Sequence, residues 1–575
     1  MEFEDIVNLV NQAAIERKGR PLKDVERLVL EGAWRHQTYS AMAEHIGGYT
    51  EDYLKKDVGP KLWRLLSDLI DYDDIRVTKR NIQNVLQHWA LHGQQGNLSD
   101  RNLAALPSDV DSVSPPNGAA PTPPRLEVWS SARLDLSEFV ARAGDLAQLQ
   151  QWLQEEDCRT IVLWGLAGMG KTTLVARLLE SQIPPETRVG YVSLFPDTTD
   201  GDLLGAVVAW LQAVEPSLPL PTGDRLGWVM RQFEQRRHLL VIDQLEELFE
   251  ADQPAGTYGP GTDRIQQFFQ RVAEHRHRSL VIWVSREKPL GLSQLRGAQV
   301  REYPLEELSL DETRLLLQRR GLRGSAQDWQ ALFHQYGGIP LLLKDISATV
   351  QEVYQGQVSP FLSTPDPGLP RLFCSELKQG LQRLTTVEID LLRWVALAHE
   401  PVPITTLMAD MVPAPPAMAI QSLLARGLCR QVEPDPVATT SLDVPAVVRY
   451  QVLNDLGLAL LQEVRQHRLG LLNRFPLVTM TAREDLQERQ RRSILHPLER
   501  HLRRCYPTEA ECTDLCRHLH QALRREGTTS PGFGAGNLIR LCECLGVSVS
   551  GMNFADLTIW QGDLRQVDLQ GADFS

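Results

Sequence analysis

Cysteine is scarce in this sequence, with 8 residues in 575, and the eight are scattered along the chain. Such spacing gives no disulfide framework and is typical of reduced thiols, so we expect a cytoplasmic protein. Cys512, Cys516, His518 and His520 stand close enough to suggest a metal site. Only the two cysteines would share a helix face, because they are four residues apart, so buried and surface helix positions are the favoured interpretation.

Long apolar runs are also lacking. No stretch approaches 18 consecutive apolar residues, so we predict no membrane-spanning helix and no membrane partner. The first ten residues, MEFEDIVNLV, have no basic region that leads into an apolar core, so we expect no secretory signal.

An excess of basic charge is the third absence. The chain has 60 Lys and Arg against 73 Asp and Glu, a net charge of −13, which argues against bulk nonspecific binding of nucleic acid. A local basic face stays open. Hydrophobic content of 42% is ordinary for globular proteins, and the length predicts several domains.

The segment 161–174 reads IVLWGLAGMGKTTL. Its first four residues suit a buried parallel strand, and the next eight fit G-x-x-x-x-G-K-[ST]. The glycines let the backbone approach a bulky anion, and N–H groups of the loop and the following helix would point at phosphate oxygens. The lysine would reach the β- and γ-phosphates, and the first threonine would ligate Mg²⁺. The predicted nucleotide contacts are Gly165, Gly168, Gly170, Lys171, Thr172 and Thr173.

Three further apolar runs, at 189–194, 239–242 and 280–284, alternate with helical stretches. This order predicts an α/β core, a parallel sheet with helices on both faces. Ligands bind at the carboxyl ends of such strands, where the glycine-rich loop also lies.

Charged residues follow two of these runs. Asp243 comes directly after the second and would hold Mg²⁺ together with Thr172. Glu246 or Glu247 could orient an attacking water, and either could equally be a solvated helix residue. Arg286 follows the third, where it can approach a γ-phosphate or form a structural salt bridge.

Residues 1–93 are predicted to form an all-helical domain, followed by a Pro-rich linker over 94–130. Residues 38–68 show a helix, a Gly47-Gly48 turn and a second helix, the order of a helix-turn-helix. The second helix exposes mixed charges, whereas DNA contact needs a basic footprint, so a protein partner is favoured over DNA. The predicted core is Met42, Ile46, Leu54, Val58, Leu62, Leu65 and Leu66.

The last residues, 548–575, change period. One column of large side chains recurs every five residues, at Phe554, Ile559, Leu564, Leu569 and Phe574, which is the repeat of a pentapeptide β-solenoid. About one turn is present, and one turn cannot bury its own core. We therefore expect the start of a longer repeat array, a shortened chain, or another element that covers the end.

Taken together, several segments resemble the STAND class of P-loop ATPases, close to the NB-ARC and NACHT families. They are GLAGMGKTTL (165–174), LLVIDQLEELF (239–249), VSRE (284–287) and GGIPLLLK (337–344), with FVARAGDL (139–146) similar to the segment that flanks the adenine. The resemblance covers roughly residues 134–465. The N-terminal part, above all KDVGPKLWRLLSD (56–68), resembles modules that head bacterial signalling ATPases of the cyanobacterial type.

The resemblance implies a domain order. A P-loop NTPase domain would span 131–300, a helical ARC-type subdomain 301–374, a winged-helix domain 375–465 and a helical connector 466–547. A capping box, Thr385-Thr386-Val387-Glu388, would open the first helix of the winged-helix domain.

The resemblance also assigns residues. Pro340 would lie near bound ADP, and Arg286 would occupy the sensor position. Asn454 stands where the family often carries a His that contacts the ADP β-phosphate, and Asn has no charge to offer there. Gln244 stands where NB-ARC proteins usually have a second Asp, so hydrolysis would use Glu246 or Glu247, or be slow.

The function that these features favour is a switch that binds ATP or ADP with Mg²⁺, hydrolyses ATP slowly and forms homo-oligomers after nucleotide exchange. An unknown protein partner would bind residues 1–93. The alternative is an ATP-dependent transcriptional regulator whose N-terminal domain binds DNA. A third reading, a constitutive ATPase coupled to mechanical work or transport, would require high basal turnover.

Overall fold

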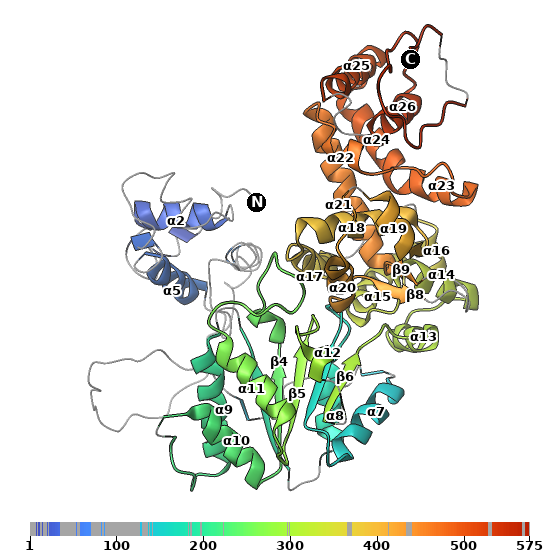
Figure 1. The fold of residues 1–575 in the computed structure, drawn as a ribbon. Coiled ribbons are helices and arrows are strands. Elements are labelled where there is room, and N and C mark those ends of the chain that lie inside the picture. The colour runs from blue at the N-terminus through green and yellow to red at the C-terminus, as the bar shows by residue number, and fades with distance from the viewer. Residues whose placement is uncertain are drawn as a thin grey trace, which may run out of the picture. The chain divides into compact units, whose positions relative to one another are not determined.

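The structure is a computed structural model (Figure 1). It describes residues 139–575 with the exception of 141, 182, 184–186, 196–197, 222, 296, 298, 365–370, 412, 433–439, 527–531, 566–569 and 574–575. Before these it describes residues 7, 10, 11, 14, 20, 22–34, 53, 54, 58–70, 82, 86, 127, 128 and 136. The chain divides into two compact units, residues 1–118 and 119–575.

The first unit is helical where it is described. It contains α2 (Asp24–Trp34) and α5 (Gly59–Ile70), which share a core with Val7, Val10 and Ala14. Of the predicted core residues, Leu54, Val58, Leu62 and Leu66 are buried and Leu65 is partly buried. Met42, Ile46 and the Gly47-Gly48 turn lie outside the described residues, as does the predicted linker apart from residues 127 and 128.

The second unit begins with an α/β domain, which confirms the predicted parallel sheet with helices on both faces. The strand order is β1-β3-β4-β5-β2-β6, and every neighbouring pair is parallel except β1 and β3. The strands are β1 (Glu127–Val128), β2 (Thr160–Trp164), β3 (Arg188–Ser193), β4 (His238–Asp243), β5 (Leu280–Ser285) and β6 (Val300–Pro304). The sheet thus continues past residue 300, where the sequence placed the end of this domain.

The central strands are buried on both faces, so alternate side chains enter two separate cores. In β4, Leu239 and Val241 enter one core, and Leu240 and Ile242 enter the other. The first core is covered by α7 (Ala143–Gln154) and α8 (Lys171–Ser181), and the second by α9 (Asp200–Val214), α10 (Arg225–Gln235) and α11 (Asp263–Glu274) (Figure 1). This arrangement explains why β4 shows an unbroken apolar run in the sequence.

Two short helices follow strands at the carboxyl edge of the sheet, η4 (Leu245–Leu248) after β4 and α12 (Leu292–Leu295) after β5. A helical region then packs on the first core. It comprises α13 (Leu310–Arg319), α14 (Ala326–Tyr336), α15 (Pro340–Tyr354), α16 (Val358–Leu362) and α17 (Arg371–Leu381).

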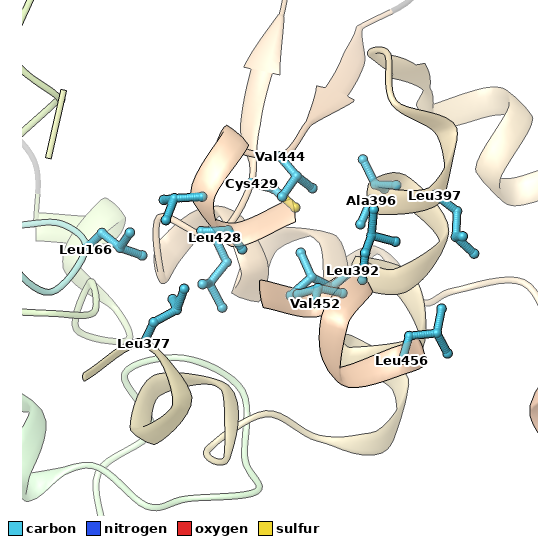
Figure 2. Packing of buried hydrophobic residues seen from close by; sticks show 14 of the residues in the cluster. Leu166, Leu377, Leu392, Ala396, Leu397, Leu428, Cys429, Val444, Val452 and Leu456 are labelled. Carbon is cyan, nitrogen blue, oxygen red and sulfur yellow. The ribbon is translucent and has the colours of Figure 1, made fainter. Parts of the chain in front are cut away.

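Residues 385–465 form helices around a small antiparallel sheet of order β7-β9-β8. The elements are α18 (Thr386–Ala398), β7 (Val402–Pro403), α19 (Ile404–Asp410), α20 (Ala417–Ala425), β8 (Arg430–Val432), β9 (Ser441–Asp443) and α21 (Ala446–Arg465). Thr385 and Glu388 form the predicted capping box at the start of α18. Side chains of this region share one core with the glycine-rich loop, where Leu166 lies towards Leu377 and Leu428 (Figure 2).

The remaining residues are mainly helical, with α22 (Gly470–Arg474), α23 (Glu484–Gln490), the π-helical η5 (Arg491–Leu495), α24 (His496–Cys505), α25 (Glu509–Glu526) and α26 (Gly534–Leu545). The turns after α26 are fixed to it by Arg540, whose guanidinium lies 2.7 Å from the Asp563 carboxylate. Asn553 forms a parallel β-bridge with Asp573, twenty residues further along. In the part of the chain that is described, no helix is long and apolar enough to cross a bilayer.

Candidate nucleotide site

The glycine-rich loop joins the end of β2 to the start of α8. Gly168 and Gly170 have φ angles of 79° and 85°, a conformation that side chains disfavour. A Cβ on Gly168 would also lie 2.8 Å from the Cβ of Leu341, so α15 packs too close to this turn for any larger residue. The loop can therefore take its shape only with glycine at this position.

Lys171 is the first residue of α8, and its side chain is buried beneath the loop. Its ammonium donates hydrogen bonds to the carbonyl oxygens of Gly165 (2.8 Å) and Leu166 (3.0 Å). The third N–H has no hydrogen-bond acceptor among the described residues, and a phosphate oxygen would supply one. Burial lowers the pKa of Lys171 to about 8, although the negative charges of Glu246 and Asp243 act to raise it. An anion bound at the loop would restore the charged form.

Asp243 ends β4 and is bound on both carboxylate oxygens. One oxygen, Oδ2, accepts the Thr172 hydroxyl at 2.8 Å and the Tyr191 phenol at 2.5 Å. The other accepts the N–H of Gln244 at 2.8 Å. Thr172 and Asp243 thus place hard oxygen atoms together beside the loop, which fits a Mg²⁺ ion, and the sequence predicted both as its ligands.

Glu246 and Arg286 form an ion pair at the same edge of the sheet. Glu246 is buried in η4, and its carboxylate lies 2.9 Å from Nε of Arg286 and accepts the backbone N–H of Arg286 at 3.0 Å. The guanidinium of Arg286 also lies 2.8 Å from the carboxylate of Glu376 in α17. The predicted sensor arginine is therefore held by two carboxylates, one of which comes from outside the α/β domain.

A second charged cluster joins the α/β domain to the region after α17. Glu287 is buried, and its Oε1 accepts hydrogen bonds from Arg383 (2.9 Å) and Arg426 (2.5 Å). Arg383 also donates to the carbonyl oxygen of Glu246. The backbone of residue 246 is thus linked through Arg383 and Glu287 to Arg426, which directly follows α20.

The structure brings Pro340 to the loop but not Asn454. A Cβ on Gly170 would lie 4.0 Å from Cγ of Pro340, and the N–H of Leu341 donates to the carbonyl of Gly168 at 3.2 Å. Asn454 is exposed on α21, and within the described ranges no hydrogen bond links it to the loop. Thr173 is half-buried in the first turn of α8, and Glu247 is half-buried in η4.

Sequence reasoning missed Tyr191, Glu287, Glu376, Arg383 and Arg426. Their partners lie far away along the chain, 96 residues for Arg383 and 139 for Arg426, so no local spacing could reveal them. For Tyr191 a signal existed, because β3 precedes β4 and parallel neighbours bring their carboxyl ends to one edge.

The cysteines and histidines of α25 have other partners. Cys512 and Cys516 are both buried, and the Cys516 thiol interacts with that of Cys542 in α26. His520 contacts the carbonyl oxygen of Asn553 at 2.7 Å, and His518 stacks on His467. Within the described ranges, no group of three or more His, Cys, Asp or Glu residues could hold a metal ion.

Two protein families match parts of the chain, and one curated protein matches most of it. Residues 154–282, which include the glycine-rich loop, β4 and the first half of β5, match the AAA domain family. Residues 1–89 match the family described as vWA-MoxR associated protein N-terminal HTH. An uncharacterized WD repeat-containing protein of Nostoc sp. is 29% identical over 500 residues, which cover 78% of this chain and 39% of that protein. The chain thus spans about two fifths of the length of this curated relative.

Two solved structures are similar at low identity. A Walker-type ATPase of Pyrococcus abyssi is 17% identical, with a TM-score of 0.40, over 54% of this chain and 95% of its own. A signal transduction ATPase with numerous domains and a tetratricopeptide repeat sensor, from Pyrococcus horikoshii, is 16% identical, with a TM-score of 0.28, over 75% of this chain and 60% of its own. From the family matches, the chain contains a P-loop ATPase domain of the AAA type and an N-terminal helix-turn-helix domain.

Proposed function

We propose that this protein is a nucleotide-operated switch of the STAND type, close to the NB-ARC and NACHT families, in which exchange of ADP for ATP controls self-association. The observation that carries the proposal is the pairing of Arg286 with both Glu246 and Glu376. It ties the residues predicted to meet the γ-phosphate to α17, at the entrance to residues 385–465. Loss or gain of a γ-phosphate would therefore change contacts that reach the following domain through Arg286 and Glu376.

In this proposal each site residue has one task. Lys171 and the loop N–H groups bind phosphate oxygens, and Thr173 adds a contact in the first turn of α8. Thr172 and Asp243 would hold Mg²⁺, which neutralises phosphate charge when it is bound. Glu246 or Glu247 orients water, Arg286 senses the γ-phosphate, and Pro340 packs near the nucleotide. Slow hydrolysis is expected, since the Glu246 carboxylate is already paired with Arg286.

The proposed domain order is the one expected from the sequence, with the α/β domain extended to the end of β6 at Pro304. A winged-helix assignment for 375–465 is supported by α18, α19 and α20, followed by the antiparallel pair β8 and β9. A pentapeptide-repeat assignment for 548–575 is supported by the parallel bridge between Asn553 and Asp573, since four faces of five residues make one turn of twenty.

Such a switch needs a nucleotide that prefers one state. ADP must favour the arrangement in which residues 385–465 pack beside the loop, and ATP must favour the other, because a ligand with equal affinity for both would shift nothing. Asn454 offers no charge to the ADP β-phosphate. We therefore place the difference at Arg286, which a γ-phosphate would draw away from Glu376.

The test is to purify the full chain, denature it and identify the released nucleotide by ion-exchange chromatography. Stoichiometric ADP from a monomer is expected, and the Lys171→Ala variant should be folded and empty. An empty wild-type protein that hydrolyses ATP steadily would overturn the switch and favour a constitutive ATPase. Normal nucleotide affinity in Lys171→Ala would overturn the site itself.

A DNA-binding regulator is the second candidate, and the helix-turn-helix match over residues 1–89 favours it. This candidate predicts salt-dependent binding of the full chain to specific DNA fragments, with affinity that changes between ADP and ATP. Selection of bound sequences from a random DNA pool would test it. Without enrichment of any sequence, the N-terminal domain is assigned to protein contact.

A further inference from the structure

Two carbonyl groups of the glycine-rich loop are bound from outside the loop. The Met169 carbonyl oxygen accepts a buried hydrogen bond from the Arg142 guanidinium at 2.9 Å. The Gly168 carbonyl oxygen accepts the Leu341 N–H at 3.2 Å. Neither donor belongs to the motif, since Arg142 precedes α7 and Leu341 lies in α15.

These bonds fix the direction of the loop N–H groups. A trans peptide is planar, so a carbonyl and the N–H of the next residue point in opposite directions. Because Arg142 binds the Met169 oxygen, the Gly170 N–H points away from Arg142. Because the Leu341 N–H binds the Gly168 oxygen, the Met169 N–H points away from Leu341. Two successive N–H groups turned to one side are what binds an anion in such loops.

Arg142 is itself held from several sides. Its guanidinium pairs with Asp145 at 2.8 Å and also donates to the Glu306 carbonyl at 3.0 Å. Its backbone N–H donates to Glu312 at 2.9 Å, and its φ of 58° is left-handed. The Tyr303 phenol in turn donates to Asp145 at 2.5 Å. Only 6% of Arg142 is exposed, so its place is set by α7, α13 and the segment after β6.

We propose that Arg142 is a positioning residue that holds the Met169–Gly170 peptide in the anion-binding direction and so sets the affinity of the loop for the β-phosphate. Arginine suits this task, because one guanidinium nitrogen reaches the Met169 and Glu306 carbonyls together while another binds Asp145. The inference depends on the proposed nucleotide site but adds a residue outside its motif.

The experiment compares ADP with AMP by isothermal titration calorimetry on the full chain freed of nucleotide. AMP lacks the β-phosphate, so the ratio of the two dissociation constants reports the loop, whereas general damage weakens both ligands alike. We expect Arg142→Gln to reduce the preference for ADP over AMP at least tenfold. Arg142→Lys should reduce this preference less, since lysine keeps the positive charge but lacks the several N–H donors of the planar guanidinium. An unchanged ratio in both variants would overturn the inference.

Two controls separate the possible failures. Arg301→Gln removes an arginine that pairs with Glu155 at 2.6 Å in the same domain, and it should keep the ADP preference. Lys171→Ala should lose it entirely. If Lys171→Ala binds ADP normally, the nucleotide site is misassigned. If Lys171→Ala loses ADP while Arg142→Gln and Arg142→Lys keep the wild-type ratio, only the role of Arg142 fails. If Arg142→Gln does not fold, the ratio in Arg142→Lys decides.

Discussion

At the scale of single residues, the site depends on groups whose side chains are already bound. Lys171 donates to two loop carbonyls, and Asp243 accepts three hydrogen bonds. Such groups lose little rotamer freedom when a ligand arrives. Affinity should therefore respond to the protonation and orientation of these residues.

The protonation of Lys171 makes nucleotide affinity depend on pH. In the free protein, burial lowers the pKa of Lys171 to about 8, and bound phosphate raises this pKa again. Nucleotide binding above pH 8 must therefore be accompanied by uptake of a proton. We expect the dissociation constant for ADP to rise about tenfold between pH 7 and pH 9, by linkage of one site. Calorimetry at pH 9 in two buffers of different ionisation enthalpy should show uptake of about one proton. No uptake would mean that Lys171 stays charged in the free protein.

Tyr191 should tune the metal requirement. Its phenol donates to the same Asp243 oxygen as Thr172, so Tyr191→Phe frees that carboxylate to rotate. One hydrogen bond to a charged group contributes about 1.5 kcal/mol or more, so the Mg²⁺ concentration for half-maximal ATP binding should rise roughly tenfold. Tyr258→Phe is a control, because the buried Tyr258 hydroxyl has no hydrogen-bond partner among the residues that the structure describes. Equal Mg²⁺ curves for wild type and Tyr191→Phe would reduce Tyr191 to a packing role.

At the scale of elements, the sequence predicts what is local and loses what is distant. The strand, glycine loop and helix around Lys171 were predictable because the motif is contiguous, and the α18 capping box because its two partners are three residues apart. The pairing of Arg286 with Glu376 was not, because periodicity carries no information on which charges meet after folding. β6 was not predicted as a strand for the same reason, since its pairing with β2 is set by tertiary packing.

The contact between α17 and Arg286 should restrain hydrolysis. Glu376→Gln removes one of the two carboxylates that hold Arg286, which frees the guanidinium to reach a γ-phosphate. Both side chains are about one third exposed, so the pair contributes at most about 1 kcal/mol, and ATP turnover should rise roughly fivefold. Steady-state phosphate release measures this. Glu352→Gln, an exposed change on α15, is the control. Slower turnover in Glu376→Gln would show that Glu376 supports the active arrangement.

At the scale of the whole second unit, the nucleotide loop and residues 385–465 form one continuous core. Leu166 of the loop shares it with Leu377, Leu428 and Val452 (Figure 2). A Cβ on Gly427 would lie 3.5 Å from the backbone nitrogen of Leu166, so the turn after α20 approaches the loop closely. Release of this region would therefore expose both the loop and an apolar surface, which is the form expected to self-associate.

Arg426 should control that release. It is 4% exposed and binds Glu287 at 2.5 Å and the Gln253 carbonyl at 2.7 Å, so it joins α20 to the α/β domain. Removing one partner of a buried ion pair costs about 3 kcal/mol or more. The Glu388 partner of Arg426 lies within residues 385–465 and is lost in both states, whereas the Glu287 partner is lost only in the packed state. Arg426→Met should therefore raise the released fraction roughly a hundredfold. We expect loss of co-purified ADP and ATP-dependent oligomers by light scattering.

The control must remove an arginine from the same region without touching the α/β domain. Arg430→Met does this, because Arg430 is 61% exposed and pairs with Asp443 on the neighbouring strand β9. It should leave both ADP content and mass unchanged. If Arg426→Met stays folded and monomeric in ATP and keeps its ADP, the Glu287 cluster stabilises the fold without gating it. The control of self-association would then have to lie in the Arg286 and Glu376 pair alone.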